Sequence, residues 1–196
     1  MTNTKYYTLL ILIVALSTVP WIVFVFFGRK IRTALRRRQN IRKETFVSIQ
    51  EITAALIKLQ KLKKGATIII KQNDDMKEAI ADQIELDAIL SSQLIVNIFE
   101  GDKSPLHDGA MIVQGSKILS ASAYITNISN QKVPKEFGTR HRSALGLSEA
   151  SDAIVIVLSE ESQRVSIFRN GKHFKVKDIA DVRTEITNQL IERENS

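Results

Sequence analysis

The sequence predicts an α/β protein in which helices surround a central mixed β-sheet, preceded by one transmembrane helix. Along most of the chain, short runs of β-branched residues alternate with segments whose apolar residues recur every three or four positions. Strands and helices that interleave in this way are typical of one sheet covered by helices. Before them lies an uncharged stretch over residues 6–27, which is long enough to cross a bilayer.

This N-terminal stretch, YYTLLILIVALSTVPWIVFVFF, contains 22 residues. As a helix it would be about 33 Å long, which exceeds the roughly 30 Å of hydrocarbon in a bilayer. A cleaved signal peptide is the alternative interpretation. It fits poorly, because the apolar run is long, Lys5 is the only base before it, and the other bases follow it. We therefore expect residues 1–28 to form an uncleaved membrane anchor.

The net charge of +7 is concentrated next to this anchor. Residues 1–43 contain nine of the 28 Lys and Arg residues and no acid, so the remainder carries 19 bases against all 21 acids. Positive residues that follow a span place what comes after them in the cytoplasm. We expect a basic juxtamembrane segment over 29–43 and a cytoplasmic domain over 44–196 of a single-pass cell-membrane protein. The nearly neutral domain argues against nucleic-acid binding, and the absence of Cys excludes disulfides and thiolate chemistry.

The domain is expected to open with a helix over residues 44–63, capped near Gly65. Residues 66–71, ATIIIK, are typical of a buried strand. Residues 74–83 begin with two acids, which favour a helix N-terminus, and predict a short helix. A second helix is predicted over residues 86–99.

The rest of the chain alternates between strands and helices. A turn is expected at residues 114–116, and Asn170–Gly171 is typical of a type I′ hairpin turn. Strands are predicted over residues 109–113, 117–125 and 152–158, a hairpin over 164–176, and helices over 140–147 and 178–194.

The stretch SPLHDGAMIV, residues 104–113, places an imidazole, a carboxylate and a glycine directly before a strand. Asp108 could coordinate a divalent cation or orient a hydroxyl, and His107 could do either, depending on its protonation. Gly109 lacks a Cβ, so a ligand or another strand could approach closely there. When the stretch is taken alone, an ordinary Asp-Gly turn is the favoured interpretation.

A second stretch, FGTRHRSALGLSEASDA over residues 137–153, begins a helix with cations. Thr139 is expected to cap this helix, which puts Arg140, His141 and Arg142 in its first turn. Cations oppose the helix dipole at that end, so this arrangement favours an anion site for phosphates. In a third stretch, VLSEES at residues 157–162, Ser159, Glu160 and Glu161 follow the end of a predicted strand, and ligands often bind where strands of α/β sheets end. Taken alone, this stretch is better explained as a polar loop.

Taken in order, SPLHDGA, GTRHRSALGLSEASDA and VLSEES closely resemble the diadenylate cyclase domain family. The Asp-Gly-Ala and Arg-His-Arg signatures both occur, with family-like spacing. The resemblance is close over residues 65–168 and extends over 44–196. It implies a central mixed sheet ringed by helices and a nucleotidyltransferase that condenses two ATP into cyclic di-AMP, as in single-span members of the family.

The resemblance also implies roles for individual residues. Asp108 and Gly109 would lie at the reacting 3′-hydroxyl, and Arg140 and His141 would complete the catalytic set. The implied metal, Mn²⁺ or Mg²⁺, would be held by Asp108, His107 and Glu161. The implied ATP contacts are Ala110, Tyr124, Gly138, Thr139, Arg140, His141, Arg142 and Ser159.

One such domain binds one ATP, so the resemblance implies a homo-oligomer in which two domains meet face to face. Three other interpretations stay open at this point. The chain could be a nucleotide sensor of the same fold without chemistry, a membrane-anchored scaffold, or a nucleic-acid-binding anchor. Intact Asp108 and Arg140–Arg142 argue against the sensor, and the near-neutral domain argues against nucleic acid as a partner.

Overall fold

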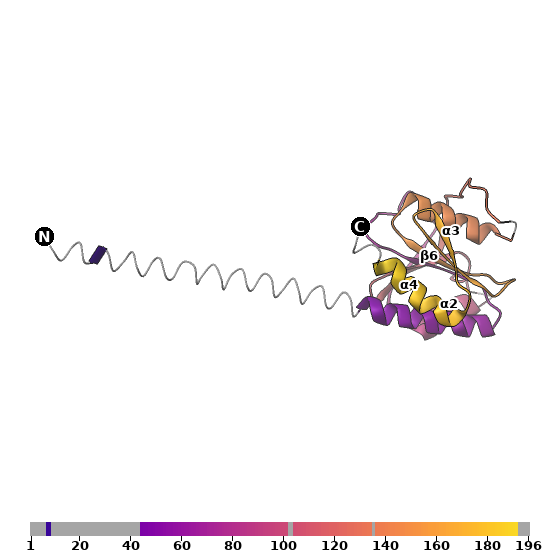
Figure 1. Ribbon diagram of the computed structural model, residues 1–196. Helices are drawn as coiled ribbons and strands as arrows, with labels where there is room; N and C mark the ends of the chain where they lie inside the picture. Colours follow the sequence, from indigo (N-terminus) through magenta and orange to yellow (C-terminus); the bar gives the residue numbers. More distant parts are fainter. Residues whose placement is uncertain (1–6, 9–43, 102–103, 135, 192–196) are drawn as a thin grey trace. The chain divides into compact units, whose positions relative to one another are not determined.

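The computed structural model describes residues 7–8, 44–101, 104–134 and 136–191 (Figure 1). The chain divides into two units, residues 1–43 and 44–196, and the description below concerns the second. The expected anchor over 1–28 and the basic segment over 29–43 lie outside the described residues, apart from positions 7 and 8. No helix within the described ranges has the length and apolar character needed to span a membrane.

Eight strands form one sheet, in the order β2-β5-β4-β1-β6-β7-β8, with β3 also paired to β5. Only the β1–β4 pair is parallel among these, so the sheet is mixed, as predicted. β1 lies in its interior, and every residue of β1 is buried, as expected for an apolar strand covered on both faces. The strands are β1 (Ala66–Ile70), β2 (Ile80–Ala81), β3 (Ile84–Ile89), β4 (Ala110–Gln114), β5 (Lys117–Ile125), β6 (Ile154–Leu158), β7 (Val165–Arg169) and β8 (Lys172–Lys175).

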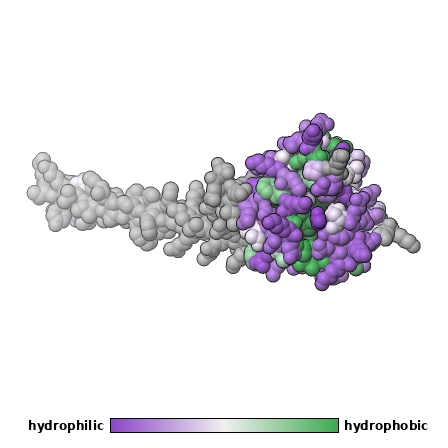
Figure 2. Space-filling view, turned by 45° about the vertical axis from the view of Figure 1, so that its right-hand side comes forward, coloured by the Kyte–Doolittle hydropathy of each residue, from purple (hydrophilic) through white to green (hydrophobic). Residues whose placement is uncertain are grey.

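Helices cover the two faces of the sheet unequally (Figure 1). One face carries the helix over residues 44–61, α2 (Ser92–Glu100) and α4 (Val182–Ile191), which bury one large apolar cluster against it. The other face carries α3 (Thr139–Ala150), which packs on a second cluster. The face seen in Figure 2 is mostly hydrophilic, with small apolar patches. Most of the large apolar side chains in the described domain are buried in these two clusters.

Two sequence predictions on the N-terminal half were wrong. Residues 74–83 form turns and the short strand β2 instead of a helix. Asp74 and Asp152 explain this, because the Asp152 carboxylate accepts the backbone N–H of Asp74 at 3.1 Å and Asp74 accepts that of Asp152 at 2.8 Å. Short acidic side chains that bond to the backbone in this way compete with helix formation.

The helix predicted over residues 86–99 is present only in its second half. Residues up to Ile89 form β3, whose sequence IELDAI alternates with a period of two and pairs with β5. Asp87 has a φ of 43°, and the pairing shifts register beside it, which is typical of a bulge. Ser91 accepts the N–H of Leu94 at 3.3 Å and so sets the start of α2.

Most remaining predictions are confirmed. The strands over 66–71, 109–113, 117–125 and 152–158 and the hairpin with Asn170–Gly171 are all present. The C-terminal helical segment begins with a short 3-10 turn, Ile179–Asp181, and continues as α4. Two caps were misplaced: Gly138, not Thr139, caps α3, and Lys63, with a φ of 57°, turns the chain after the first helix before Gly65 is reached.

Candidate active site

A cavity of about 620 Å³ opens at one edge of the sheet. β1 and β4 run parallel and both begin at this edge, whereas β5 and β6 run antiparallel to them and end there. The N-terminus of α3 contributes a further wall. This topology therefore brings together chain segments that are far apart in sequence.

Gly109 shapes the floor of the cavity where β4 begins. Its φ is 105°, and a Cβ there would lie 2.8 Å from the Ala123 carbonyl oxygen and from the Ser122 carbonyl carbon. Only glycine tolerates both this conformation and so close an approach of β5. The exposed side chain of Asp108 precedes it, and the buried Ala110 follows it.

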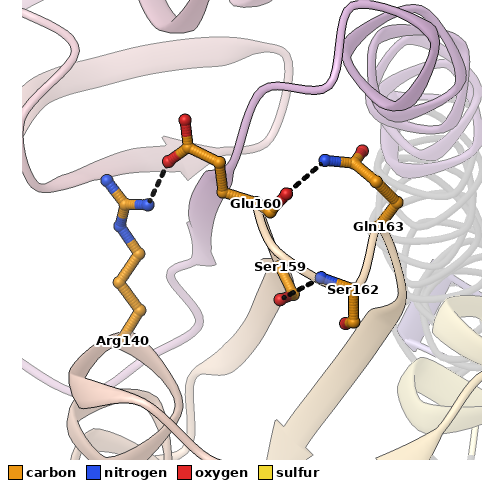
Figure 3. Close-up of polar contacts among 5 residues, drawn as sticks. All are labelled: Arg140, Ser159, Glu160, Ser162 and Gln163. Carbon is orange, nitrogen blue, oxygen red and sulfur yellow. Dashed lines mark hydrogen bonds and ion pairs between the residues drawn. The ribbon is translucent and has the colours of Figure 1, made fainter.

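Arg140, in the first turn of α3, forms an ion pair with Glu160 across the cavity (Figure 3). Arg140 Nη1 lies 3.3 Å from Glu160 Oε2, and both side chains are substantially exposed. The guanidinium also lies against the backbone of Gly65, where an added Cβ would come within 2.8 Å of Nη1. An exposed pair of this kind contributes little stability, so a stronger anion could displace Glu160 from Arg140.

The loop after β6 is held by its own hydrogen bonds (Figure 3). Ser159 Oγ accepts the N–H of Ser162 at 3.2 Å, and Gln163 Nε2 donates to the Glu160 carbonyl at 2.6 Å. The Gln163 N–H donates to the Ser159 carbonyl at 3.0 Å. These bonds present Ser159 and Glu161 at the cavity in a fixed turn.

His141 is buried at the other side of the α3 N-terminus. Its ring stacks on Phe137 at a centroid distance of 4.7 Å and meets Phe168 edge-on at 6.1 Å. Burial lowers the pKa of His141, and the nearby His173 lowers it further. A histidine with a lowered pKa is neutral at pH 7, so Arg140 supplies the positive charge on this wall.

Ten of the twelve residues singled out in the sequence line this one cavity. They are Asp108, Gly109, Ala110, Tyr124, Gly138, Thr139, Arg140, His141, Ser159 and Glu161. The two others, His107 and Arg142, are not among its lining residues. His107 Nδ1 lies 2.5 Å from the Ser104 carbonyl instead, and Arg142 is exposed on the helix.

Sequence reasoning missed several lining residues, among them the polar Thr67 on β1 and the apolar Ile125 and Ile128. It included Glu160 in the VLSEES stretch but assigned it no role, although Glu160 lines the cavity. Thr67 gave no local signal, since threonine is common in strands.

Carboxylates are the candidate metal ligands at the cavity. Asp108, Glu160 and Glu161 all line it, and carboxylate oxygens suit Mg²⁺ and Mn²⁺. The described part of the chain contains no group of three His, Asp or Glu residues placed to hold a metal by themselves. This donor set therefore fits a cation that also binds substrate phosphates, as Mg²⁺ usually does.

Comparison with known proteins identifies the family. Residues 53–173 match the profile described as "DAC: DisA bacterial checkpoint controller nucleotide-binding". The chain belongs to this family. A diadenylate cyclase of Mycoplasma genitalium is 37% identical to it over 159 residues, which cover 76% of this chain and 78% of that protein.

Other members of the DAC family agree with this assignment. A diadenylate cyclase of Listeria monocytogenes is 35% identical, over 82% of this chain but 66% of its own length, so the chain spans just under two thirds of that protein. A crystal structure of a double mutant of DacA from Staphylococcus aureus superposes with a TM-score of 0.68 and 33% identity, covering 75% of this chain and 97% of that one. A membrane-spanning protein from Bacillus cereus, described as hypothetical, superposes with a TM-score of 0.62 and 38% identity, over 66% and 63% of the two chains.

Proposed function

We propose that this chain is a diadenylate cyclase, which condenses two ATP molecules into cyclic di-AMP and two pyrophosphates. The observation that carries the proposal is the convergence of Asp108–Gly109–Ala110, the start of α3 and the Ser159–Glu161 loop on one cavity. Relatives that bear the name diadenylate cyclase support it. The cavity volume of about 620 Å³ lies within the range of small-molecule sites.

In the proposed reaction, the ribose 3′-oxygen of one ATP bonds to the α-phosphorus of the other. The bond between the α-phosphorus and the oxygen that bridges it to the β-phosphorus breaks, pyrophosphate leaves, and the hydroxyl proton is lost. The same step then repeats with the roles exchanged: the 3′-oxygen of the second nucleotide bonds to the α-phosphorus of the first, which closes the ring. Asp108 would orient the attacking hydroxyl and accept its proton, and Arg140 would stabilise the charge that builds on the pyrophosphate.

Phosphate binding by Arg140 would require it to release Glu160. Phosphate carries more charge than a carboxylate and can accept two guanidinium N–H bonds, so exchange of partners is favourable. The first backbone N–H groups of α3 would add further donors, because no side chain in the described ranges caps this helix. Ser159 and Thr139 are proposed as neutral phosphate contacts, and Tyr124 as a stacking surface for adenine.

A divalent cation, Mn²⁺ or Mg²⁺, would polarise the α-phosphate when bound. Asp108 and Glu161 are the proposed ligands among this chain's residues. His107 is a weaker candidate than the sequence suggested, because it does not line the cavity and its Nδ1 faces a backbone carbonyl.

The reaction needs two copies of the cavity facing each other, each with one ATP. We propose that residues 1–28 anchor the chain in the cell membrane by a single span and that residues 29–43 hold the domain on the cytoplasmic side. Confinement to a surface would raise the rate at which domains meet. The sequence pattern of residues 1–43 supports this part of the proposal.

The deciding experiment incubates the full-length chain with ATP and Mn²⁺ or Mg²⁺ and identifies the products by mass-resolved chromatography. Cyclic di-AMP is expected from the wild type. Asp108→Asn is expected to lower its formation at least a hundredfold while ATP binding largely survives, because the variant keeps the size of the side chain but loses the carboxylate. Full activity of Asp108→Asn would sink the assignment of Asp108, and ATP binding without any product from the wild type would indicate a nucleotide sensor.

A further inference from the structure

Thr67 is a buried polar residue without a hydrogen-bond partner among the described residues. It is 3% exposed, and its buried hydroxyl oxygen forms no hydrogen bond within that part of the chain. Buried hydroxyls are normally paired, because an unpaired one retains the full cost of leaving water. An exception of this kind at a cavity points to a ligand that would supply the missing partner.

The side chain of Thr67 belongs to the cavity face of the sheet. Its strand neighbours Ala66 and Ile68 pack in the cluster under the helix over residues 44–61, whereas Ile69 packs in the cluster under α3. Successive strand residues point to opposite faces, so Thr67 shares its face with Ile69. Thr67 accordingly lines the cavity, together with its cross-strand partner Val157.

The surroundings of Thr67 explain why its hydroxyl has no hydrogen-bond partner among the residues that the structure describes. Val157 and Ala110, on the two flanking strands, are apolar and line the same floor. Two residues before Thr67, just ahead of β1, the backbone of Gly65 lies against the guanidinium of Arg140. Thr67 therefore lies on the strand next to β4, which begins at Ala110, and two residues along the chain from the Gly65 backbone that Arg140 approaches.

We propose that the Thr67 hydroxyl donates a hydrogen bond to a phosphate oxygen of bound ATP, as a substrate-binding residue. This inference rests on the proposed function. A phosphate oxygen is the acceptor that fits, because Arg140 draws the phosphates to this part of the cavity and phosphate offers acceptors only. The hydroxyl thus costs stability in the empty protein and is satisfied when the nucleotide binds.

This arrangement predicts opposite effects of one substitution on stability and on binding. Thr67→Val keeps the shape of the side chain and removes the hydroxyl. The nucleotide-free variant is expected to unfold at an equal or higher urea concentration, because an unpaired buried group is gone. Its affinity for the triphosphate is expected to fall on the order of tenfold, which is typical for loss of a hydrogen bond to a charged group.

The experiment uses the full-length chain and 3′-deoxy-ATP, which lacks the attacking hydroxyl and so cannot cyclise. Dissociation constants for 3′-deoxy-ATP and 3′-deoxyadenosine are measured by calorimetry for the wild type, Thr67→Val and Thr67→Ser. The loss in Thr67→Val is expected for the triphosphate alone, and Thr67→Ser is expected to bind within about threefold of the wild type. Thr53→Val is the matched control, since Thr53 is a buried threonine that does not line the cavity and whose hydroxyl is satisfied by the Ile49 carbonyl at 2.7 Å.

Three results would overturn the inference: unchanged triphosphate affinity in Thr67→Val, an equal loss for 3′-deoxyadenosine, or a loss of affinity that accompanies a loss of stability. Production of cyclic di-AMP by the wild type is assayed alongside. Product from the wild type with unchanged binding by Thr67→Val would reject the role of Thr67 and keep the proposed function. A binding defect in Thr67→Val without product from the wild type would keep the role of Thr67 in triphosphate binding and reject the proposed function.

Discussion

Gly109 combines a backbone conformation and a close contact that no other residue type would accept. Its φ is 105°, and an added Cβ would overlap the backbone of β5 at 2.8 Å. Gly109→Ala is expected to lower the free energy of unfolding by about 2 to 4 kcal/mol, as the sum of backbone strain and overpacking. Urea denaturation measures this. Gly101→Ala is the control, because its φ is not positive and its Cβ would make only ordinary contacts, with Ser104 Cβ at 3.4 Å and the Asn97 carbonyl oxygen at 3.6 Å. An equal loss there would contradict the explanation.

At this scale, the sequence predicted residues whose chemistry stands out against their neighbours. Asp108 directly precedes Gly109 and a predicted strand, Arg140 follows Gly138–Thr139 at the start of a predicted helix, and both line the cavity. His107 was included as a possible metal ligand, but its ring Nδ1 lies against a backbone carbonyl. Thr67 was missed because what distinguishes it is the lack of a partner, which depends on three strands meeting.

At the scale of elements, α3 is joined to the β7–β8 hairpin by an aromatic stack. His141 packs on Phe137, and His173 packs on Phe168 at 5.1 Å and on Phe137 at 4.8 Å. Burial lowers the pKa of both imidazoles. His173 lowers that of His141 further, Lys175 lowers that of His173, and Glu136 opposes this by raising it.

These pKa shifts predict that acid weakens the domain. Below about pH 6.5 the unfolded chain binds protons at these histidines more readily than the native protein does, so the free energy of unfolding falls as pH falls. His173→Phe keeps an aromatic ring in the stack and removes one titrating group, and it is expected to reduce this slope. Urea unfolding of both proteins between pH 7.5 and 5.5 measures the effect, and parallel slopes would contradict it.

Elements with a single clear periodicity were predictable, whereas elements set by distant contacts were not. The strand over 66–70 and the hairpin at Asn170–Gly171 follow from apolar runs and turn chemistry alone. β3 was assigned to a helix because its apolar residues continue into those of α2. Its pairing with β5 makes it a strand. Residues 74–83 do not form a helix because the side chains of Asp74 and Asp152 each accept a hydrogen bond from the other's backbone N–H.

At the scale of the whole molecule, one cavity offers one set of reacting groups, whereas the proposed product needs two new bonds. A pair formed by a wild-type chain and an Asp108→Asn chain could therefore make at most one of them. Adding a tenfold excess of Asp108→Asn to the wild type is expected to lower cyclic di-AMP per wild-type chain severalfold and to leave linear dinucleotide.

Product analysis by mass spectrometry checks this expectation, with the same mass of an unrelated protein as the control. If the yield of cyclic product per wild-type chain did not change with the excess variant, the face-to-face arrangement would be rejected. The proposed reaction chemistry would then need both bonds to form within one chain.

The strand order has a consequence for how the protein comes into being. β1, in the interior of the sheet, is flanked by β4 and β6, and the cavity draws residues from Thr67 to Glu161. A chain emerging from the ribosome therefore holds β1 without its partners until most of the domain has been made. ATP can stabilise only a chain in which that sheet is complete. ATP in the cell would thus stabilise completed domains against unfolding but would not stabilise nascent chains. Nascent chains would rely on chaperones to cover the apolar strand β1.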